Sequence, residues 1–243
     1  MVGGDLSSGD DVVVAVTVHG DLGGRAPVLR SGAQVSDVVA HAGRRGWSAA
    51  GLALLDHDLG PLDQGLVDAY LRPEPPLDAG PESAAMLDLS DGLLRDAGRL
   101  AAASGVRLDL DPGAFAADRD VLRSAARAVA AATGLGDPGW GPGRSDVDGM
   151  LDGWIWGGGE DHSLLATFPP DVELPAGWTA VGRVLEAPVD GGVPSGGAAD
   201  AAGGDGAGGA DGATSDGGTA PAPAVTIGGE APDVGQGWDH FRS

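Results

Sequence analysis

The stretch at residues 84–110, AAMLDLSDGLLRDAGRLAAASGVRLDL, has the pattern of a strand, a helix and a second strand. Residues 84–89 are largely apolar and have the length of a strand. Apolar side chains then recur at helical spacing, at Leu93, Ala97, Leu100 and Ala101. Ser90 or Asp91 is expected to cap this helix, because either side chain can accept hydrogen bonds from the first helical turn. Residues 106–110 are expected to form the next strand.

Further strands and helices are expected on both sides of this stretch. Strands are predicted at residues 11–18, 37–42, 163–168 and 179–185. Helices are predicted at residues 48–56, 66–71 and 118–133. The run at 11–18 (DVVVAVTV) is β-branched and apolar, and glycine and proline turn signals follow it, so a buried strand is expected there. The alternation of strands and helices indicates an α/β or α+β fold.

Composition is that of a globular protein with one large domain or two modest ones. Of the 243 residues, 42% are hydrophobic, which is enough to build a packed core. The formal net charge is -22 and all 14 basic residues are arginine, so neither a nucleic-acid partner nor a membrane surface is expected. The chain has no cysteine, no signal-peptide pattern at its start and no long apolar run, which fits a cytoplasmic protein.

Residues 191–224 differ in kind from the rest of the chain. They contain 12 glycines and no Leu, Ile, Phe, Trp or Tyr. Such a segment cannot bury enough apolar surface to offset its ordering entropy, so it is predicted to be a disordered insert. A Ca²⁺-binding Gly-Asp repeat is the alternative, but the nonapeptide register of such repeats is absent.

The motif DLSDGL at residues 88–93 places carboxylates and a hydroxyl where a strand ends and a helix begins. The unsatisfied N–H groups of a helix start favour a phosphate, and Mg²⁺ prefers one or two carboxylates together with phosphate oxygens. Asp88 and Ser90 can share one face of the strand, while Asp91 follows at the turn. The motif therefore suggests a metal-bridged phosphate site, with an ordinary helix cap as the alternative.

The motif GGGEDHSLL at residues 157–165 is a glycine hinge followed by an acidic pair and a strand. Glycines let the backbone approach a ligand closely, and Glu160 with Asp161 could bind a cation or a cationic ring. A polar turn is the alternative. A single histidine, His162, follows the pair without a second ligand at metal spacing, so no metal site is assigned to it.

Three further segments carry weaker signals. GRRGWSAAG at residues 43–51 lacks the GK[ST] ending of a phosphate-binding P-loop, and its arginines, Arg44 and Arg45, are expected to face solvent. Arg30, in RSGA, is a better phosphate candidate because small residues surround it. VGGD at residues 2–5 is weak alone, with a simple turn as its alternative.

The C-terminal segment GWDHF, at residues 237–241, carries two large aromatic side chains. It is expected to dock on the fold, since exposed aromatic rings forfeit hydrophobic stabilisation. Packing is one role for Trp238, and stacking on a ligand ring is the other.

The order of these motifs is more specific than any one of them. VGGD, RSGA, a glycine loop with SAAGL, DLSDGL, GGED and GWDHF follow one another along the chain. This series resembles the thiamine-monophosphate kinases from about the second fifth of their sequence to its end. Aminoimidazole-ribonucleotide and selenophosphate synthetases share the general fold but not the whole series.

The resemblance implies an α/β (α+β) fold like that of aminoimidazole-ribonucleotide synthetase, the PurM-like fold. Residues 1–28 would be the remnant of an N-terminal domain that binds ATP and metal, and residues 29–190 would form a C-terminal α/β domain. Residues 191–224 would be the disordered insert, and residues 225–243 a tail docked on the C-terminal domain.

The resemblance also implies ATP- and Mg²⁺-dependent phosphorylation of thiamine monophosphate to thiamine diphosphate. ATP contacts would come from Gly4, Asp5, Arg30 and Ser90. Magnesium ligands would be Asp5, Asp88 and Asp91, and thiamine contacts would be Glu160 and Trp238, with Asp161 beside them.

The family's N-terminal portion, with further magnesium ligands, has no counterpart in this sequence. Little or no turnover is therefore expected from the 243-residue chain itself, and a homodimer is expected only at full length. The sequence departs from the family in smaller ways too: Leu6 stands where the family usually has Thr, and His162 where it usually has Tyr. A non-catalytic module that binds thiamine phosphates is the alternative function, and another ATP-dependent enzyme of the same fold is a further one.

Overall fold

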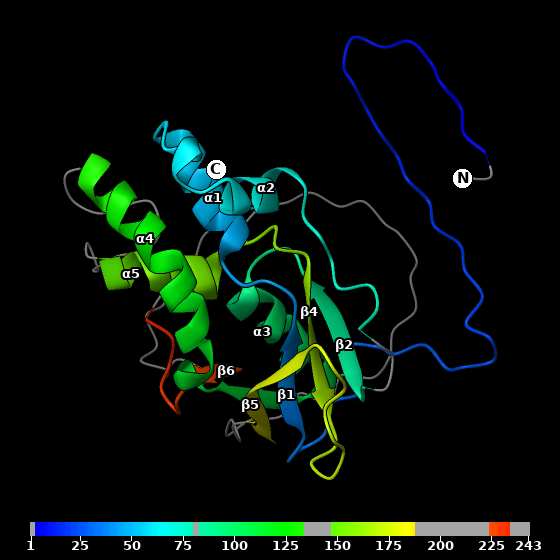
Figure 1. The fold of residues 1–243 in the computed structure, drawn as a ribbon. Coiled ribbons are helices and arrows are strands. Elements are labelled where there is room, and N and C mark those ends of the chain that lie inside the picture. Colours follow the sequence, from blue (N-terminus) through cyan, green and yellow to red (C-terminus); the bar gives the residue numbers. More distant parts are fainter. Residues whose placement is uncertain (1–2, 80–82, 134–146, 188–223, 234–243) are drawn as a thin grey trace, which may run out of the picture.

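The computed structural model describes residues 3–79, 83–133, 147–187 and 224–233. Its strands form one sheet in the order β2-β4-β1-β5-β3-β6 (Figure 1). The strands are β1 Val38–Ala42, β2 Ala85–Leu89, β3 Val106–Leu110, β4 Ser163–Phe168, β5 Trp178–Glu186 and β6 Val225–Ile227. Neighbouring strands are antiparallel except β3 and β6, which are parallel. The fold is thus a mixed sheet covered by helices, as the sequence predicts.

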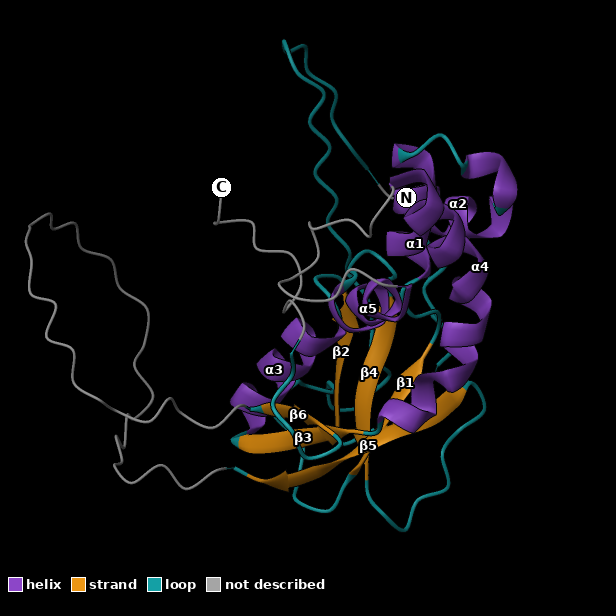
Figure 2. Ribbon diagram, turned by 90° about the vertical axis from the view of Figure 1, so that its left-hand side faces the viewer, coloured by secondary structure: helices purple, strands orange, loops and turns teal. Residues whose placement is uncertain are grey.

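The helices form two groups around this sheet (Figures 1 and 2). They are α1 Trp47–Asp56, α2 Gln64–Leu71, α3 Leu93–Ser104, α4 Ala116–Thr133 and α5 Val147–Asp152. Short 3₁₀ turns lie at Gly60–Leu62 and Pro112–Phe115, and a π-helical turn at Gly153–Gly157 follows α5 directly. Helix α3 packs against β2 and β3, whereas α1 packs on α2 and α4 beyond one end of the sheet.

The core has a large and a small part, because alternate residues of each strand point to opposite faces of the sheet. Val39 and Leu165 face the large cluster between sheet and helices. The opposite face carries a small cluster of Ala40, Ala42, Ala166, Phe168 and Trp178. In this cluster the rings of Phe168 and Trp178 meet edge to face, with centroids 5.2 Å apart.

Most predicted elements are confirmed, with ends that differ by at most two residues. The predicted strand at 163–168 coincides with β4, and the predicted helix at 118–133 corresponds to α4. Strand β6, helix α5 and the π-helical turn were not predicted. The predicted insert at 191–224 lies outside the described residues except for Ala224, and the GWDHF segment lies wholly outside them.

The predicted cap of α3 is wrong. The residue before the helix is Gly92, with φ 111°, and it makes no side-chain capping bond. Instead the carboxylate of Asp96, in the first turn, accepts a hydrogen bond from the N–H of Asp91 at 2.9 Å. An acidic side chain in the first turn, where N–H groups lack helical partners, provides the stabilisation that was expected from the cap.

The predicted buried strand at residues 11–18 is also wrong. Residues 3–27 are all exposed and contain no strand, and Figure 1 shows this segment extending away from the folded body. Val12 is 95% exposed and Val18 is 86% exposed. A strand is stable only when a neighbouring strand satisfies its N–H and C=O groups, and no described strand lies beside this segment. The β-branched sequence therefore favours a strand locally, but the described fold provides no neighbouring strand to pair with it.

The exposed valines of residues 11–18 lead to a prediction about self-association. Changing both Val14 and Val16 to Asp should reduce the share of dimers and larger species in sedimentation velocity, because each buried Val side chain contributes about 1.5 kcal/mol. Leu77→Asp is the matched control, since Leu77 is 86% exposed in another part of the chain. Equal association of the double variant and the control variant would contradict the prediction.

The chain joins the folded body along the outer side of β2. The N–H of Met86 donates to the carbonyl of Leu29 at 3.3 Å. A Cβ at Gly32 would lie 2.1 Å from the carbonyl oxygen of Ala84, so only glycine fits this crossing. Residues 28–33 therefore cover part of the edge strand β2, which limits its exposure to other chains.

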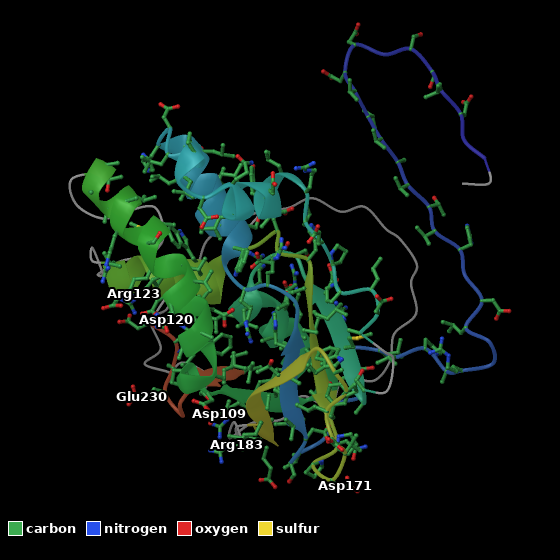
Figure 3. All side chains as sticks on the ribbon, viewed as in Figure 1. Asp109, Asp120, Arg123, Asp171, Arg183 and Glu230 are labelled. Atoms are coloured by element: carbon green, nitrogen blue, oxygen red, sulfur yellow. The ribbon has the colours of Figure 1, made fainter. Side chains whose placement is uncertain are left out.

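A buried carboxylate adds to the backbone pairing that holds strand β6 to β3. Asp109 on β3 accepts hydrogen bonds from the Thr226 hydroxyl at 2.8 Å and from the Gly229 N–H at 2.7 Å. Its second oxygen lies 3.3 Å from the guanidinium of Arg183 (Figure 3). Burial alone would raise the pKa of Asp109, but these contacts outweigh it and lower the pKa below its usual value. The short strand thus depends on a side chain of its neighbour.

None of the helices in the described part of the chain is long and apolar enough to cross a membrane.

Candidate functional site

Two loops that are far apart in the sequence meet at one end of the sheet. Residues 90–92 follow β2, and residues 158–162 precede β4, the antiparallel neighbour of β2. The N–H of Glu160 donates to the carbonyl of Ser90 at 2.9 Å, and the N–H of His162 donates to the carbonyl of Leu89 at 3.2 Å. The DLSDGL and GGED motifs therefore form one site, which we call the two-loop site.

Glycines allow the two loops to touch. A Cβ at Gly159 would lie 2.6 Å from the carbonyl oxygen of Ser90. A Cβ at Gly92 would lie 2.6 Å from the carbonyl oxygen of Gly157, and Gly92 also has φ 111°, which L side chains rarely adopt. Side chains at these positions would force the loops apart.

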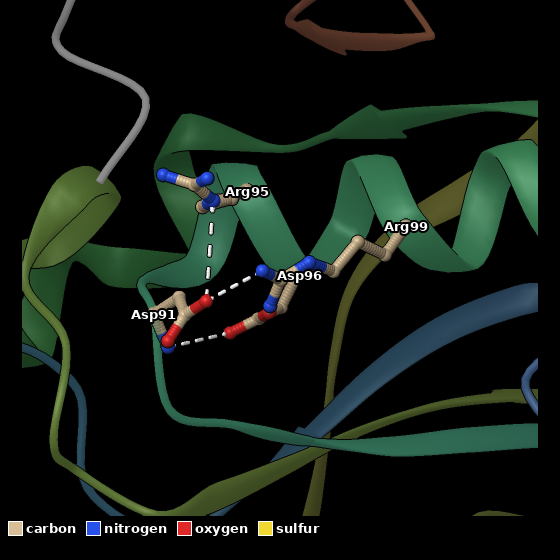
Figure 4. A network of polar contacts seen from close by, with 4 residues as sticks. All are labelled: Asp91, Arg95, Asp96 and Arg99. Carbon is tan, nitrogen blue, oxygen red and sulfur yellow. Dashed lines mark hydrogen bonds and ion pairs between the residues drawn. The ribbon is translucent and has the colours of Figure 1, made fainter. Parts of the chain in front are cut away.

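A network of charges surrounds the start of α3 (Figure 4). The guanidinium of Arg99 lies 2.5 Å from Asp91 and 2.6 Å from Asp96, and Arg95 lies 3.9 Å from Asp91. Burial raises the pKa of Asp96, and the hydrogen bond to Asp91 raises the pKa of Arg99. Asp91, a predicted magnesium ligand, is therefore already paired with a cation in this structure.

The carboxylates of DLSDGL have the chemistry that a magnesium site needs, but they do not complete one. Asp88 is exposed on β2, opposite Leu164 of β4, and Asp91 is partly buried. Within the described ranges, no group of three or more His, Asp or Glu side chains is placed to hold a metal ion. Because Mg²⁺ takes one or two carboxylates plus phosphate oxygens, these donors fit the ion only together with further ligands.

Glu160 presents its carboxylate to solvent from a strained backbone. Its side chain is 63% exposed, and its φ is 65°, which is uncommon for a residue other than glycine. His162, with φ 48°, places its Nε2 atom 3.4 Å from a carboxylate oxygen of Glu160. The loop thus holds an acidic side chain outward beside Ser90.

Asp161, the neighbour of Glu160, points inward to the start of α1. Its carboxylate accepts hydrogen bonds from the N–H groups of Gly46 at 2.5 Å and Ser48 at 2.8 Å. Helix α1 has no cap from its own residue Gly46, so a residue more than a hundred positions away satisfies its first turn. Burial raises the pKa of Asp161 to about 6, although the hydrogen bonds from Ser48, Gly46 and Trp47 act in the opposite direction.

The raised pKa of Asp161 predicts a pH-dependent stability difference. Because the folded pKa of about 6 exceeds the usual value, the folded state binds more protons between about pH 4 and 6. The wild-type chain should therefore lose unfolding free energy relative to Asp161→Asn as pH rises through this window. Urea unfolding at about pH 4.5, 6 and 7.5 measures the difference. A difference that stays constant with pH would contradict the assignment.

A second buried polar group lies beneath the site and was not predicted. The side chain of Arg45 is only 12% exposed, pairs with Asp118 at 3.0 Å and lies over the ring of Phe115. The expectation that Arg45 faces solvent is wrong, because aromatic packing and a buried partner compensate its desolvation. His41 donates to or accepts from the Ser163 hydroxyl at 2.9 Å, and burial, with Arg45 nearby, lowers the pKa of His41.

Arg44 follows the expectation more closely. It forms an exposed ion pair with Glu74 at 3.0 Å and lies over the ring of Trp47. Neighbouring arginines with the same sequence context thus have opposite environments, and no local pattern distinguishes them.

The structure does not bring the other predicted ATP residues, Gly4, Asp5 and Arg30, to the two-loop site. Gly4 and Asp5 lie in the exposed segment of residues 3–27. The carbonyl of Arg30 accepts a hydrogen bond from Ser104, at the opposite end of α3 from the site, about 16 Å away along the helix. Trp238 lies outside the described residues.

Comparisons with solved structures define the class of fold. A structure described as "AaThiL complexed with AMPPCP and TMP" is similar with a TM-score of 0.57 and 24% identity, over 88% of this chain and 54% of that one. A crystal structure of thiamine monophosphate kinase from Aquifex aeolicus is similar with a TM-score of 0.51 and 28% identity, over 65% of this chain and 51% of that one. The predicted PurM-like fold is confirmed.

Sequence comparisons show the same similarity to thiamine-monophosphate kinases. Thiamine-monophosphate kinase of Mycobacterium tuberculosis (strain CDC 1551 / Oshkosh) is 47% identical over 193 residues, which are 77% of this chain and 52% of the relative. The Corynebacterium glutamicum kinase is 39% identical over 197 residues, or 76% of this chain and 53% of the relative. No protein-family model matches the chain.

Over this matched region the chain is similar to the thiamine-monophosphate kinases, as the order of its motifs predicts. It spans about half the length of the curated relatives that it matches.

Proposed function

We propose that this chain takes part in the ATP-dependent phosphorylation of thiamine monophosphate to thiamine diphosphate, with Mg²⁺ as the metal ion. The observation that carries the proposal is the two-loop site, where the loop with Ser90 and Asp91 contacts the loop with Glu160, in a fold similar to that of thiamine monophosphate kinase. Similarity to thiamine-monophosphate kinases supports the choice of reaction.

The reaction joins two phosphates and needs no protein nucleophile. A terminal oxygen of the thiamine monophosphate phosphate forms a bond to the γ-phosphorus of ATP, and the bond from that phosphorus to the β–γ bridging oxygen breaks. ADP leaves with the electron pair. Such a transfer depends on holding both phosphates in line and on neutralising their charge.

The residues of this chain would divide these tasks. Ser90 would donate its hydroxyl to a phosphate of ATP. Gly4, Asp5 and Arg30 lie away from the two-loop site in this structure, so they would have to move to it to complete the nucleotide contacts. Asp88 and Asp91, with Asp5, would hold Mg²⁺, which when bound supplies positive charge to the phosphate oxygens. Asp91 is paired with Arg99 in this structure, so Asp91 would have to leave the guanidinium in order to bind the metal.

Glu160 would bind the thiamine moiety. Its exposed carboxylate beside Ser90 can pair with the cationic thiazolium ring, and Trp238 would stack on the thiamine. A cytoplasmic location and a homodimer for the whole protein are further proposals, supported by the family resemblance.

A second candidate function is binding of thiamine phosphates without turnover. It is favoured by the position of Gly4 and Asp5, which lie in the exposed segment and not at the two-loop site. Asp88, Asp91 and Glu160 would then be enough to bind thiamine phosphates, but not to transfer the phosphoryl group.

Two measurements test these functions. Calorimetry should show saturable binding of thiamine monophosphate in the presence of Mg²⁺, and Glu160→Gln should weaken it about tenfold, because it removes the negative charge that pairs with the thiazolium ring. Glu173→Gln, at an exposed position away from the site, is the control. Chromatography of thiamine diphosphate after incubation with ATP then separates the kinase from the binding module. Absence of binding heat with ATP, Mg²⁺ and thiamine monophosphate all present would contradict both.

A further inference from the structure

Asp161 is joined to the rest of the fold through its side chain, whereas Glu160 is joined through its backbone. The Asp161 carboxylate accepts two N–H groups of the α1 start, from Gly46 and Ser48. Its neighbour Glu160 makes a backbone bond to Ser90 and leaves its own carboxylate mostly exposed. Adjacent acidic residues therefore have different surroundings, and Asp161 has its oxygens occupied by protein.

The loop that carries both residues is strained. Glu160 and His162 have φ values of 65° and 48°, in the left-handed region that favours glycine. Such conformations persist only where the surrounding structure determines them, and they concentrate at functional sites. Asp161 lies between the two strained residues, so its hydrogen bonds to α1 can keep both neighbours in their strained conformations.

This loop contacts the other loop of the two-loop site, at Ser90. Gly159 approaches Ser90 so closely that a Cβ would lie 2.6 Å from the Ser90 carbonyl oxygen. Movement of the loop away from α1 would therefore move Glu160 relative to Ser90 and Asp91. Asp161 therefore connects this loop to α1, and the backbone of Glu160 connects it to the Ser90 loop.

We infer that Asp161 is a positioning residue, which fixes the strained loop to α1 so that Glu160 is held beside Ser90, and that it does not contact the substrate itself. The sequence had suggested Asp161 as a substrate contact beside Glu160. The inference rests on the proposed function only in taking Glu160 as the residue that binds thiamine monophosphate; the anchoring of the loop is independent of any ligand.

The first test measures the anchor without ligand, by hydrogen exchange of single amides in the full chain. Asp161→Asn should accelerate exchange of the Glu160 and His162 N–H groups about tenfold or more, because the loop loses hydrogen bonds to a charged group. Amides in the middle of α3 should keep their wild-type rates. Unchanged rates at Glu160 and His162, or equal acceleration throughout α3, would overturn the inference.

Asp63→Asn is the matched control for this exchange experiment. Asp63 caps α2 by accepting the N–H of Leu66 at 3.1 Å, so the variant makes the same chemical change at another helix start. It should leave exchange at Glu160 and His162 unchanged. Acceleration of these two amides by the control would also overturn the inference, since the effect would not be specific to the Asp161 anchor.

The second test is a double-mutant cycle on thiamine monophosphate binding, measured by calorimetry. Glu160→Gln and Asp161→Asn should each weaken binding about tenfold, and the double variant should bind no more weakly than either one, because both changes act through one contact. Losses that multiply to about a hundredfold would overturn the inference. If the wild-type chain binds no thiamine monophosphate, the proposed function fails, and the exchange experiment still decides the positioning role.

Discussion

Replacing Gly159 with alanine is expected to weaken thiamine monophosphate binding about tenfold, as much as Glu160→Gln does, while the chain stays folded. The new Cβ would lie 2.6 Å from the carbonyl oxygen of Ser90, and a backbone carbonyl cannot rotate out of the way as a flexible side chain can. The loop must move, which breaks the hydrogen bond from Glu160 to Ser90 and displaces the Glu160 carboxylate. The loss should match that of Glu160→Gln, because both changes remove the same contact with the ligand. Calorimetry measures the affinity.

Gly98→Ala is the control for this prediction. Gly98 lies inside α3, where an added Cβ would meet no atom within 4 Å. The substitution should leave binding unchanged and stabilise the chain by about 0.5–1 kcal/mol, because alanine favours a helix interior over glycine. If Gly159→Ala binds as tightly as the wild type, contact between the two loops is not needed for the ligand.

Replacing Asp109 with alanine should release β6 from the sheet and destabilise the chain by about 2–3 kcal/mol. The substitution removes the acceptor of Thr226 and Gly229, and a buried group left without a partner costs about 1–3 kcal/mol. Strand β6 has only three residues, so it has few other bonds to compensate. Urea unfolding gives the free energy, and hydrogen exchange of the Gly228 N–H, which donates to Leu110, reports the release.

Asp111→Ala separates the loss of this contact from a general loss of negative charge. Asp111 is exposed, lies two residues further along, and caps only the short 3₁₀ turn by accepting the Gly113 N–H at 2.8 Å. It should cost less than 1 kcal/mol, at the low end of what a lost cap costs. Equal destabilisation by the two variants would show that Asp109 does not hold β6.

The elements that could be predicted from the sequence are those with a strong local pattern. Helix α3 and strand β4 have clear apolar periodicity over their length, and both were found where the sequence placed them. Strand β6 was missed because its three residues carry no such pattern and its stability comes from Asp109, more than a hundred positions earlier. The predicted strand at 11–18 had the pattern, but no partner strand lies beside it in the described part of the chain.

The candidate site was predictable in its parts and not in its assembly. DLSDGL and GGED could be singled out because they combine acidic side chains with glycines at element boundaries. That they touch follows from the antiparallel register of β2 and β4, which sets Leu89 opposite Ser163 and which no local pattern encodes. The inward direction of Asp161 and the burial of Arg45 were missed for the same reason, since both depend on partners from other elements.

The attachment of the exposed N-terminal segment has a consequence for anything that pairs with it. Residues 28–33 run beside β2, whose far end carries Ser90, so the segment acts as a tether fixed to the site's own strand. The tether from Val12–Val18 to residue 28 is about 10–16 residues long, which gives an unstructured chain a root-mean-square reach of about 16–24 Å. A partner strand that pairs with Val12–Val18 would therefore be kept near the sheet at an effective concentration of about millimolar, even if the partner strand and the sheet make no direct contact.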